Sequence, residues 1–222
     1  MFNLKIVLIL LLINSNQVNA IGLNVSTSGG FLIDGSSESV ADFEWGDPRL
    51  FFGGQSSLAI GGVNSLIVNN SQYFKVAKLT YKNTDIKSTK TSTNTFSDFS
   101  SVYLEMTLHY ADSNSVGSYN FGADIDVTES SNGDSDTDDR VSVLFDNGLS
   151  PAFSFGGTDY VFELLGFENK TNGFDSFFIQ PEGSVSSVDL YAKITAVPIP
   201  SALWLFMTAL SGFIITGNRK RK

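Results

Sequence analysis

The chain contains no cysteine and only one histidine, His109. Without cysteine no disulfide can hold the fold, so a hydrophobic core must stabilise it. A nucleophilic triad needs a histidine with a hydroxyl and a carboxylate converging on it, and no G-x-S-x-G turn is present. One histidine without cysteine also leaves too few ligands for a zinc site. The sequence therefore predicts no enzyme, although paired glycosidase carboxylates stay an open alternative among so many acids.

Basic residues are scarce in the body of the chain. All 23 acidic residues lie within 21–196, against nine lysines and arginines there, which gives this segment a formal charge of −14. Binding to nucleic acid depends on lysine and arginine displacing counterions from phosphates. No nucleic-acid partner is expected, and the acidic body suits a domain that stays soluble outside the cell.

No long helical period occurs within the body, and alternation of apolar and polar residues takes its place. In "SVYLEMTLHY", Val102, Leu104, Met106, Leu108 and Tyr110 share one face, with His109 on the other. Similar runs occupy 74–81, 121–127, 140–145, 160–167, 176–180 and 188–195. Alternation with period two is typical of antiparallel strands that cover a core on one side. We expect an all-β fold, an antiparallel β-sandwich or jelly roll.

Phenylalanine is abundant, with 19 residues, and some occur in pairs. Neighbouring residues of a strand point to opposite faces, so the two members of Phe51-Phe52 or Phe177-Phe178 cannot both enter one core. One member is expected to fill the interior while the other packs at an edge. An aromatic ring on the outer face could instead stack on a sugar.

The acidic segment "DIDVTESSNGDSDTDDR" raises calcium as the one cofactor to consider, since calcium takes six to eight oxygen ligands. An EF-hand starting at Asp134 is rejected, because Asp139 stands where glycine is required and Phe145 where glutamate is required. A looser site stays open, and the alternative is a solvated acidic loop. The acids that such a site would draw on are Asp124, Asp126, Asp134, Asp136, Asp138 and Asp139.

The N-terminus has the three parts of a secretory signal peptide. Lys5 supplies the positive charge, residues 6–13 (IVLILLLI) are uniformly apolar, and Val18-Asn19-Ala20 ends a polar segment with the small residues that signal peptidase accepts. We expect cleavage after Ala20. A buried N-terminal helix or strand is the alternative.

The C-terminal tail (residues 197–222) has the layout of a membrane anchor. Ser201 to Gly217, including Trp204, is 17 residues without a charge. As a helix this segment is roughly 25 Å long, slightly short of a ~30 Å hydrocarbon core. Four basic residues, Arg219, Lys220, Arg221 and Lys222, close the chain and should stay cytoplasmic. The predicted order is a signal peptide over 1–20, an extracellular domain over 21–196 and the C-terminal tail.

The stretch "VPIPSALWLF" in this tail resembles the bacterial PEP-CTERM sorting signal in its VPLPA-type variant. Val197, Pro198 and Pro200 match the recognition motif, although Ile199 replaces the usual leucine and Ser201 a common alanine. The resemblance implies recognition by exosortase, a transpeptidase-like membrane enzyme that cuts near the prolines. The protein would be held in the inner membrane before sorting and would then reach the cell surface or exopolysaccharide matrix. A permanent single-pass anchor is the alternative.

The body is similar to the choice-of-anchor K domain in five blocks, which are "FEWGDP", "SSLAIGG", "KLTYKN", "FELLGF" and "EGSVSSVDLYAKIT". The family consists of bacterial surface domains, and no catalytic or binding residues follow from the similarity. The expected function is that of an exported surface or matrix protein with a structural or adhesive role. A carbohydrate-binding module, with or without calcium, is the alternative, and exopolysaccharide is the partner that either reading suggests.

Overall fold

The computed structural model describes residues 22–32, 39–45, 55–84, 101–112, 115–128, 138–145, 152–169, 171 and 173–197. These residues form strands and no helix, and so include no helix that is long and apolar enough to span a membrane. The strands are β1 (Leu23–Leu32), β2 (Ser39–Val40), β3 (Asp42–Trp45), β4 (Ser56–Gly62), β5 (Leu66–Val68), β6 (Tyr73–Lys82), β7 (Ser101–Ala111), β8 (Val116–Thr128), β9 (Asp138–Phe145), β10 (Ala152–Phe155), β11 (Thr158–Asn169), β12 (Gly173–Asp175), β13 (Phe177–Pro181) and β14 (Val185–Ala196).

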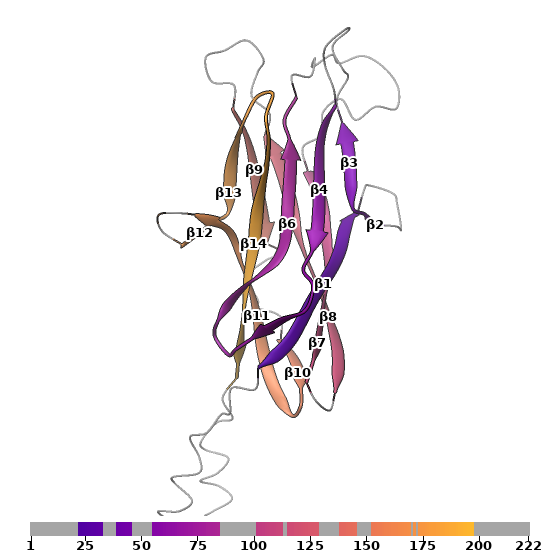
Figure 1. The fold of residues 1–222 in the computed structure, drawn as a ribbon, viewed down its shortest axis with the longest axis vertical. Helices are drawn as coiled ribbons and strands as arrows, with labels where there is room; N and C mark the ends of the chain where they lie inside the picture. Colours follow the sequence, from indigo (N-terminus) through magenta and orange to yellow (C-terminus); the bar gives the residue numbers. More distant parts are fainter. Residues whose placement is uncertain are drawn as a thin grey trace, which may run out of the picture.

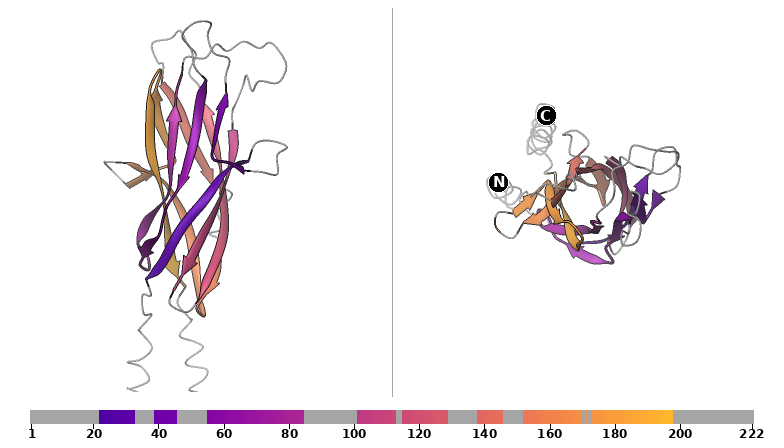
Figure 2. Two further views of the ribbon diagram at one scale, coloured as in Figure 1. Left: turned by 45° about the vertical axis from the view of Figure 1, so that its right-hand side comes forward. Right: turned by 90° about the horizontal axis from the view of Figure 1, so that it is seen from above.

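The strands make two curled antiparallel sheets that face each other around one core (Figures 1 and 2). Sheet A has the order β13-β9-β8-β7-β1-β2, with β5 paired to β1. Sheet B has the order β10-β11-β14-β6-β4-β3, with β12 paired to β11. The expected all-β class is confirmed, and the arrangement is consistent with a β-sandwich.

Alternation in the sequence corresponds to alternation in burial. On β7 the apolar set from Val102 to Tyr110 is buried, and on β8 the set from Phe121 to Val127 is buried. The Phe177-Phe178 pair divides as expected. Phe178 packs against Phe167 with ring centroids 5.0 Å apart, while the Arg140 guanidinium lies 3.9 Å from the centroid of the Phe177 ring.

Aromatic rings from both sheets fill the core. At one end, Phe31 of β1, Phe43 and Trp45 of β3, and Tyr81 of β6 form a row with neighbouring centroids 5.3, 5.2 and 5.7 Å apart. Elsewhere Phe121 of sheet A meets Phe162 of sheet B at 4.6 Å. Contacts of this kind add about 0.5–1.5 kcal/mol each to the burial of the rings, so the phenylalanine-rich composition serves the joining of the sheets.

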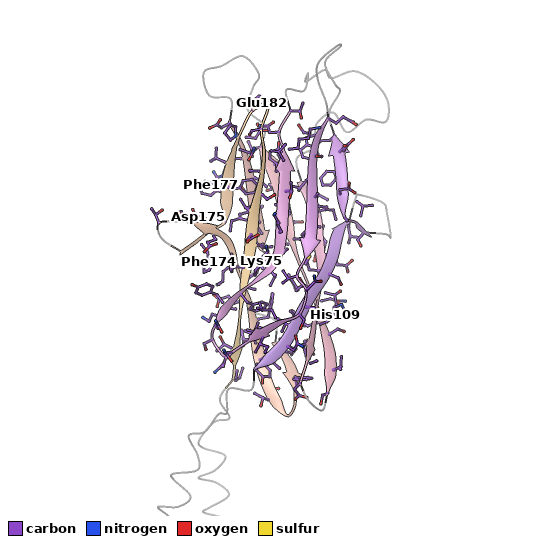
Figure 3. The ribbon with its side chains drawn as sticks, viewed as in Figure 1. Lys75, His109, Phe174, Asp175, Phe177 and Glu182 are labelled. Carbon is purple, nitrogen blue, oxygen red and sulfur yellow. The ribbon has the colours of Figure 1, made fainter. Side chains whose placement is uncertain are left out.

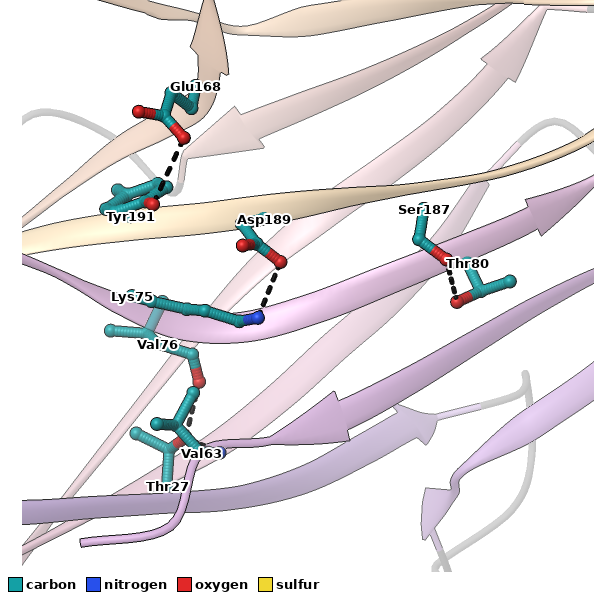
Figure 4. Close-up of polar contacts among 9 residues, drawn as sticks. All are labelled: Thr27, Val63, Lys75, Val76, Thr80, Glu168, Ser187, Asp189 and Tyr191. Atoms are coloured by element: carbon teal, nitrogen blue, oxygen red, sulfur yellow. Dashed lines mark hydrogen bonds and ion pairs between the residues drawn. The ribbon is translucent and has the colours of Figure 1, made fainter. Parts of the chain in front are cut away.

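Thr27 ties the two sheets together at the side where β1 passes β4. Its hydroxyl donates to the backbone oxygen of Val76 on β6 and accepts from the backbone nitrogen of Val63 at 2.8 Å (Figure 4). Gly62 lies at the same crossing. A Cβ there would lie 2.8 Å from the carbonyl carbon of Thr27 and closer still to its oxygen. The close approach of the sheets therefore requires a residue without a side chain.

The first and last strands of the body meet at one end of the molecule. Leu23, at the start of β1, pairs with Val68 of β5. In the turn that follows, Asn70 accepts a hydrogen bond from the backbone nitrogen of Ala196 at 2.7 Å, and the Ser71 nitrogen donates to the Ile194 oxygen at 2.8 Å. Figure 1 shows the start of β1 and the end of β14 at this shared end.

Candidate functional site

The acidic residues considered for calcium do not all face one way. Asp138 is exposed, whereas Asp139 is only 2 % exposed and accepts a hydrogen bond from the Tyr81 hydroxyl at 2.7 Å. Successive strand residues point to opposite faces, so these two side chains do not converge. Asp134 and Asp136 lie outside the described residues. A calcium site around them stays a prediction, and it would have to form without the Asp139 side chain.

Asp124 and Asp126 lie on the outer face of sheet A, between the buried residues Ala123, Ile125 and Val127 of β8. Across the described ranges, no three His, Asp or Glu side chains lie close enough together to hold a metal ion.

Only one residue of the predicted sorting motif falls within the described ranges. Val197 is exposed, and its backbone nitrogen donates to the Asp159 oxygen at 2.7 Å. The signal peptide (residues 1–20) lies outside the described residues. So do Pro198, Pro200, Ser201, Trp204, Gly217, Arg219, Lys220, Arg221 and Lys222.

His109 is exposed on the outer face of sheet A, as the alternation predicts, and its Nε2 lies 3.2 Å from the Ser28 hydroxyl oxygen (Figure 3). The contact joins the neighbouring strands β1 and β7, whose pairing places Ser26 directly opposite His109. The residue belongs to a polar sheet surface.

An aromatic cluster on the outer face of sheet B is the most distinctive surface feature among the described residues. It consists of Tyr73 on β6, Phe174 on β12 and Tyr191 on β14. The ring centroids are 5.3 Å apart for Tyr73 and Phe174, 6.0 Å for Tyr73 and Tyr191, and 5.3 Å for Phe174 and Tyr191. Tyr73 is 57 % exposed, so much of its side chain is open to solvent. Figure 3 labels Phe174 and Asp175 on β12, with Lys75 on the neighbouring part of the sheet.

Two irregularities in sheet B bring these rings together. The register of β14 shifts against β6 between Leu190 and Tyr191, and that of β11 against β14 shifts between Leu164 and Gly166. Such bulges re-aim the side chains that follow them. Gly166 has a φ of +113°, and a Cβ on it would lie 3.0 Å from the Asp175 carbonyl carbon. Glycine at this position lets β12 approach β11 and deliver Phe174.

Polar groups lie beside the aromatic cluster, and Figure 4 shows two of their contacts, Tyr191 with Glu168 and Lys75 with Asp189. The Tyr191 hydroxyl donates to Glu168 Oε2 at 3.1 Å, and Asn169 donates to the Asp175 carboxylate. Lys75 Nζ lies 2.6 Å from Asp189 Oδ1, and Lys193 Nζ lies 3.6 Å from Glu163 Oε2. These two lysines are matched by two acids, Glu168 and Asp175 add two further negative charges, and Lys78, opposite Asp189 on the same face, adds one positive charge. The surroundings of the rings are therefore polar and net acidic.

The electrostatics of this surface predict a loss of stability in alkali. Burial raises the pKa of Tyr191 above the ordinary value of 10.0, and the hydrogen bond to Glu168 and the charges of Glu168 and Asp189 raise that pKa further. Burial also raises the pKa of Tyr119 and Tyr160. The folded state thus binds these protons more tightly than the unfolded chain. The free energy of unfolding should keep this contribution below pH 10 and lose it as the pH rises through the folded-state pKa values.

Urea denaturation at stepped pH values measures this effect. Tyr191→Phe, which cannot ionise, is the matched control and should lose less stability between pH 10 and the folded-state pKa. If the free energy of unfolding fell equally steeply with pH in the variant and in the parent chain, the assignment to Tyr191 would be contradicted.

The sequence indicates only part of this site. Tyr191 falls on the polar face of the alternating run at 188–195, which marks it as an outward aromatic. No such signal marks Phe174, because β12 is only three residues long. No known protein family model and no curated protein matches the chain.

Proposed function

We propose that this chain is an exported, non-catalytic domain of the bacterial surface or exopolysaccharide matrix, with a structural or adhesive role. The observation that carries the proposal is the shared end of the body, where β5 pairs with the start of β1 and Asn70, in the turn after β5, accepts a hydrogen bond from Ala196 at the end of β14. A signal peptide and a membrane-anchoring tail would both leave from that end. The opposite end of the sheets would then project away from the membrane.

The finer architecture that goes with this role is a β-sandwich between a cleaved signal peptide and a C-terminal transmembrane helix. Consecutive strands β7, β8 and β9 pair side by side in sheet A. Such a meander is compatible with a simple sandwich and with a jelly roll, because a Greek key also contains three consecutive paired strands. The composition supports the same role. Without cysteine the domain relies on its core for stability, and its net negative charge keeps it soluble.

Signal peptidase and an exosortase-like transpeptidase are the proposed processing enzymes. The first would release Ile21 as the new N-terminus, and the second would cut near Val197, Pro198 and Pro200. The membrane segment would then hold the protein only until sorting.

Mass spectrometry of protein extracted from the cell surface tests this proposal. We expect a chain that begins at Ile21 and ends near Val197, because both recognition sequences lie at these positions. Pro198→Ala with Pro200→Ala should leave the tail intact and the protein in the inner membrane. A surface-extracted chain that still carries Arg219–Lys222 would point to a permanent anchor, and a cytosolic chain that retains Met1 would overturn export.

Saccharide binding is the second candidate function. The outer aromatic cluster with its polar surroundings favours it, because exposed rings on a sheet face do not serve the core. An adhesive matrix protein and a saccharide-binding module are compatible roles for one exported domain.

A further inference from the structure

We infer that the outer aromatic cluster of sheet B is the binding site for one pyranose unit of a neutral or amino-substituted saccharide. This inference rests on the second candidate function and names its site and ligand class. The site consists of Tyr73, Phe174 and Tyr191, with Glu168 and Asp175 beside them. The C–H face of a pyranose carries partial positive charge and packs on the electron-rich face of an aromatic ring.

The angles between the rings limit the ligand to a single sugar unit at the rings. Tyr73 is inclined at 73° to Phe174 and at 70° to Tyr191. Rings so inclined share no common plane, so a polysaccharide chain cannot lie flat across all three. Tyr73 is the most exposed member, and its ring offers the surface on which one sugar stacks. Phe174 and Tyr191 hold that ring in place.

The hydrogen-bonding groups beside the rings match sugar hydroxyls, which both donate and accept. Glu168 and Asp175 supply carboxylate acceptors, and Asn169 and Lys75 supply donors. Tyr191 and Asn169 already bond to these carboxylates, which fixes the acceptors before a ligand arrives. Groups held in place in this way lower the entropic cost of binding.

Charge selects the class of sugar. With Lys75 matched by Asp189 and Lys193 by Glu163, the remaining Glu168 and Asp175 make the surroundings of the rings negative. Juxtaposition of like charges suppresses the binding of a wrong partner. Uronic-acid saccharides would be repelled, whereas neutral sugars are tolerated and amino sugars are attracted.

The same charges argue against a protein partner at this place. The fully buried core of a protein interface is depleted in charged residues. Here Glu168, Asp175 and two ion pairs lie directly beside the three rings. A sugar, which needs an aromatic face and several polar groups within a few ångströms, fits this arrangement better.

A glycan array probed with the full-length chain in detergent tests the inference. The array carries neutral, amino-sugar and uronic-acid oligosaccharides, each scored at several protein concentrations. We expect binding to the first two classes and about tenfold weaker binding for Tyr73→Ala. Tyr73→Leu should be about as weak, because leucine restores apolar bulk without a ring face. Tyr103→Ala, which removes an exposed tyrosine from the outer face of sheet A, is the matched control and should bind like the parent chain.

Removing the negative charges beside the rings gives a readout that loss of folding would not imitate. Glu168→Gln with Asp175→Asn keeps hydrogen-bonding groups while it removes both charges. This variant should gain binding to uronic-acid saccharides by about tenfold relative to neutral ones. An unchanged preference would overturn the role of these two acids.

The outcomes separate the inference from the functions it builds on. Strongest binding to uronic-acid saccharides, or unweakened binding by Tyr73→Ala, overturns the site assignment and leaves saccharide binding in place. Full binding by Tyr73→Leu shows a general apolar contact and contradicts stacking. No binding to any saccharide by the parent chain overturns the second candidate function itself, whereas export is judged separately by the processed termini.

Discussion

Replacing Gly62 by alanine should lower the free energy of unfolding by about 3 kcal/mol. The new Cβ would lie 2.8 Å from the carbonyl carbon of Thr27 and 3.2 Å from the Ser28 Cα. These are backbone atoms, which no rotamer change can move aside. To relieve the overlap, β1 and β4 would have to separate, which would strain the hydrogen bonds from Thr27 to Val76 and from Val63 to Thr27. Thermal unfolding followed by circular dichroism should show a midpoint lower by about 6–12 °C.

Gly61 provides the control for this substitution on the neighbouring residue. A Cβ there would meet nothing within 4 Å. Gly61→Ala should therefore leave stability unchanged or raise it by up to about 1 kcal/mol, because alanine has less conformational entropy to lose on folding. Equal effects of the two substitutions would show that chain entropy matters at this crossing and that close packing does not.

The strands with strong alternation were predictable from the sequence, because burial on one face of a sheet selects apolar residues at every second position. Val102 to Tyr110 on β7 and Phe121 to Val127 on β8 are the clearest cases. The segment that forms β1, "LNVSTSGGFL", gives no such signal. Its Thr27 is buried because the hydroxyl has partners on β6 and beside β4, which lie 49 and 36 residues away in the sequence. Such distant partners cannot be inferred from local pattern.

Asp139 shows how register decides the role of an acidic residue. In "DDRVSVLF" the residues Val141 and Val143 are buried, and Asp139 shares their face of β9. Alternation extended backward by two residues places its carboxylate inside, where the Tyr81 hydroxyl meets it. The acidity of the preceding segment suggested a ligand for calcium instead. Composition describes a loop well, but within a strand the alternation of faces takes precedence.

The aromatic cluster could not be found from the sequence as a unit. Its members lie at positions 73, 174 and 191, and two register shifts decide which way Tyr191 and its neighbours point. A shift of one residue moves every following side chain to the other face. Local sequence shows which residues could face outward, whereas the bulges determine which of them meet.

Trp45→Ala should be the most destabilising single substitution in the aromatic row, at about 4 kcal/mol. The Trp45 side chain is only 2 % exposed, and its ring stacks on Phe43 at 5.2 Å and on Tyr81 at 5.7 Å. Phe43 in turn meets Phe31 of sheet A at 5.3 Å, so the indole supports a row of rings that joins the sheets. Its removal would leave a large cavity that the strands around it cannot fill.

Urea denaturation followed by circular dichroism measures this loss without relying on the fluorescence that the substitution removes. Trp45→Phe keeps one ring in the row and should cost less than half as much. Phe177→Ala removes a ring that faces outward beneath Arg140 and should cost about 1 kcal/mol or less. If Trp45→Ala were no more harmful than Phe177→Ala, the row of rings would not be joining the sheets. The joining of the sheets would then depend more on other contacts in the core, such as that of Phe121 with Phe162.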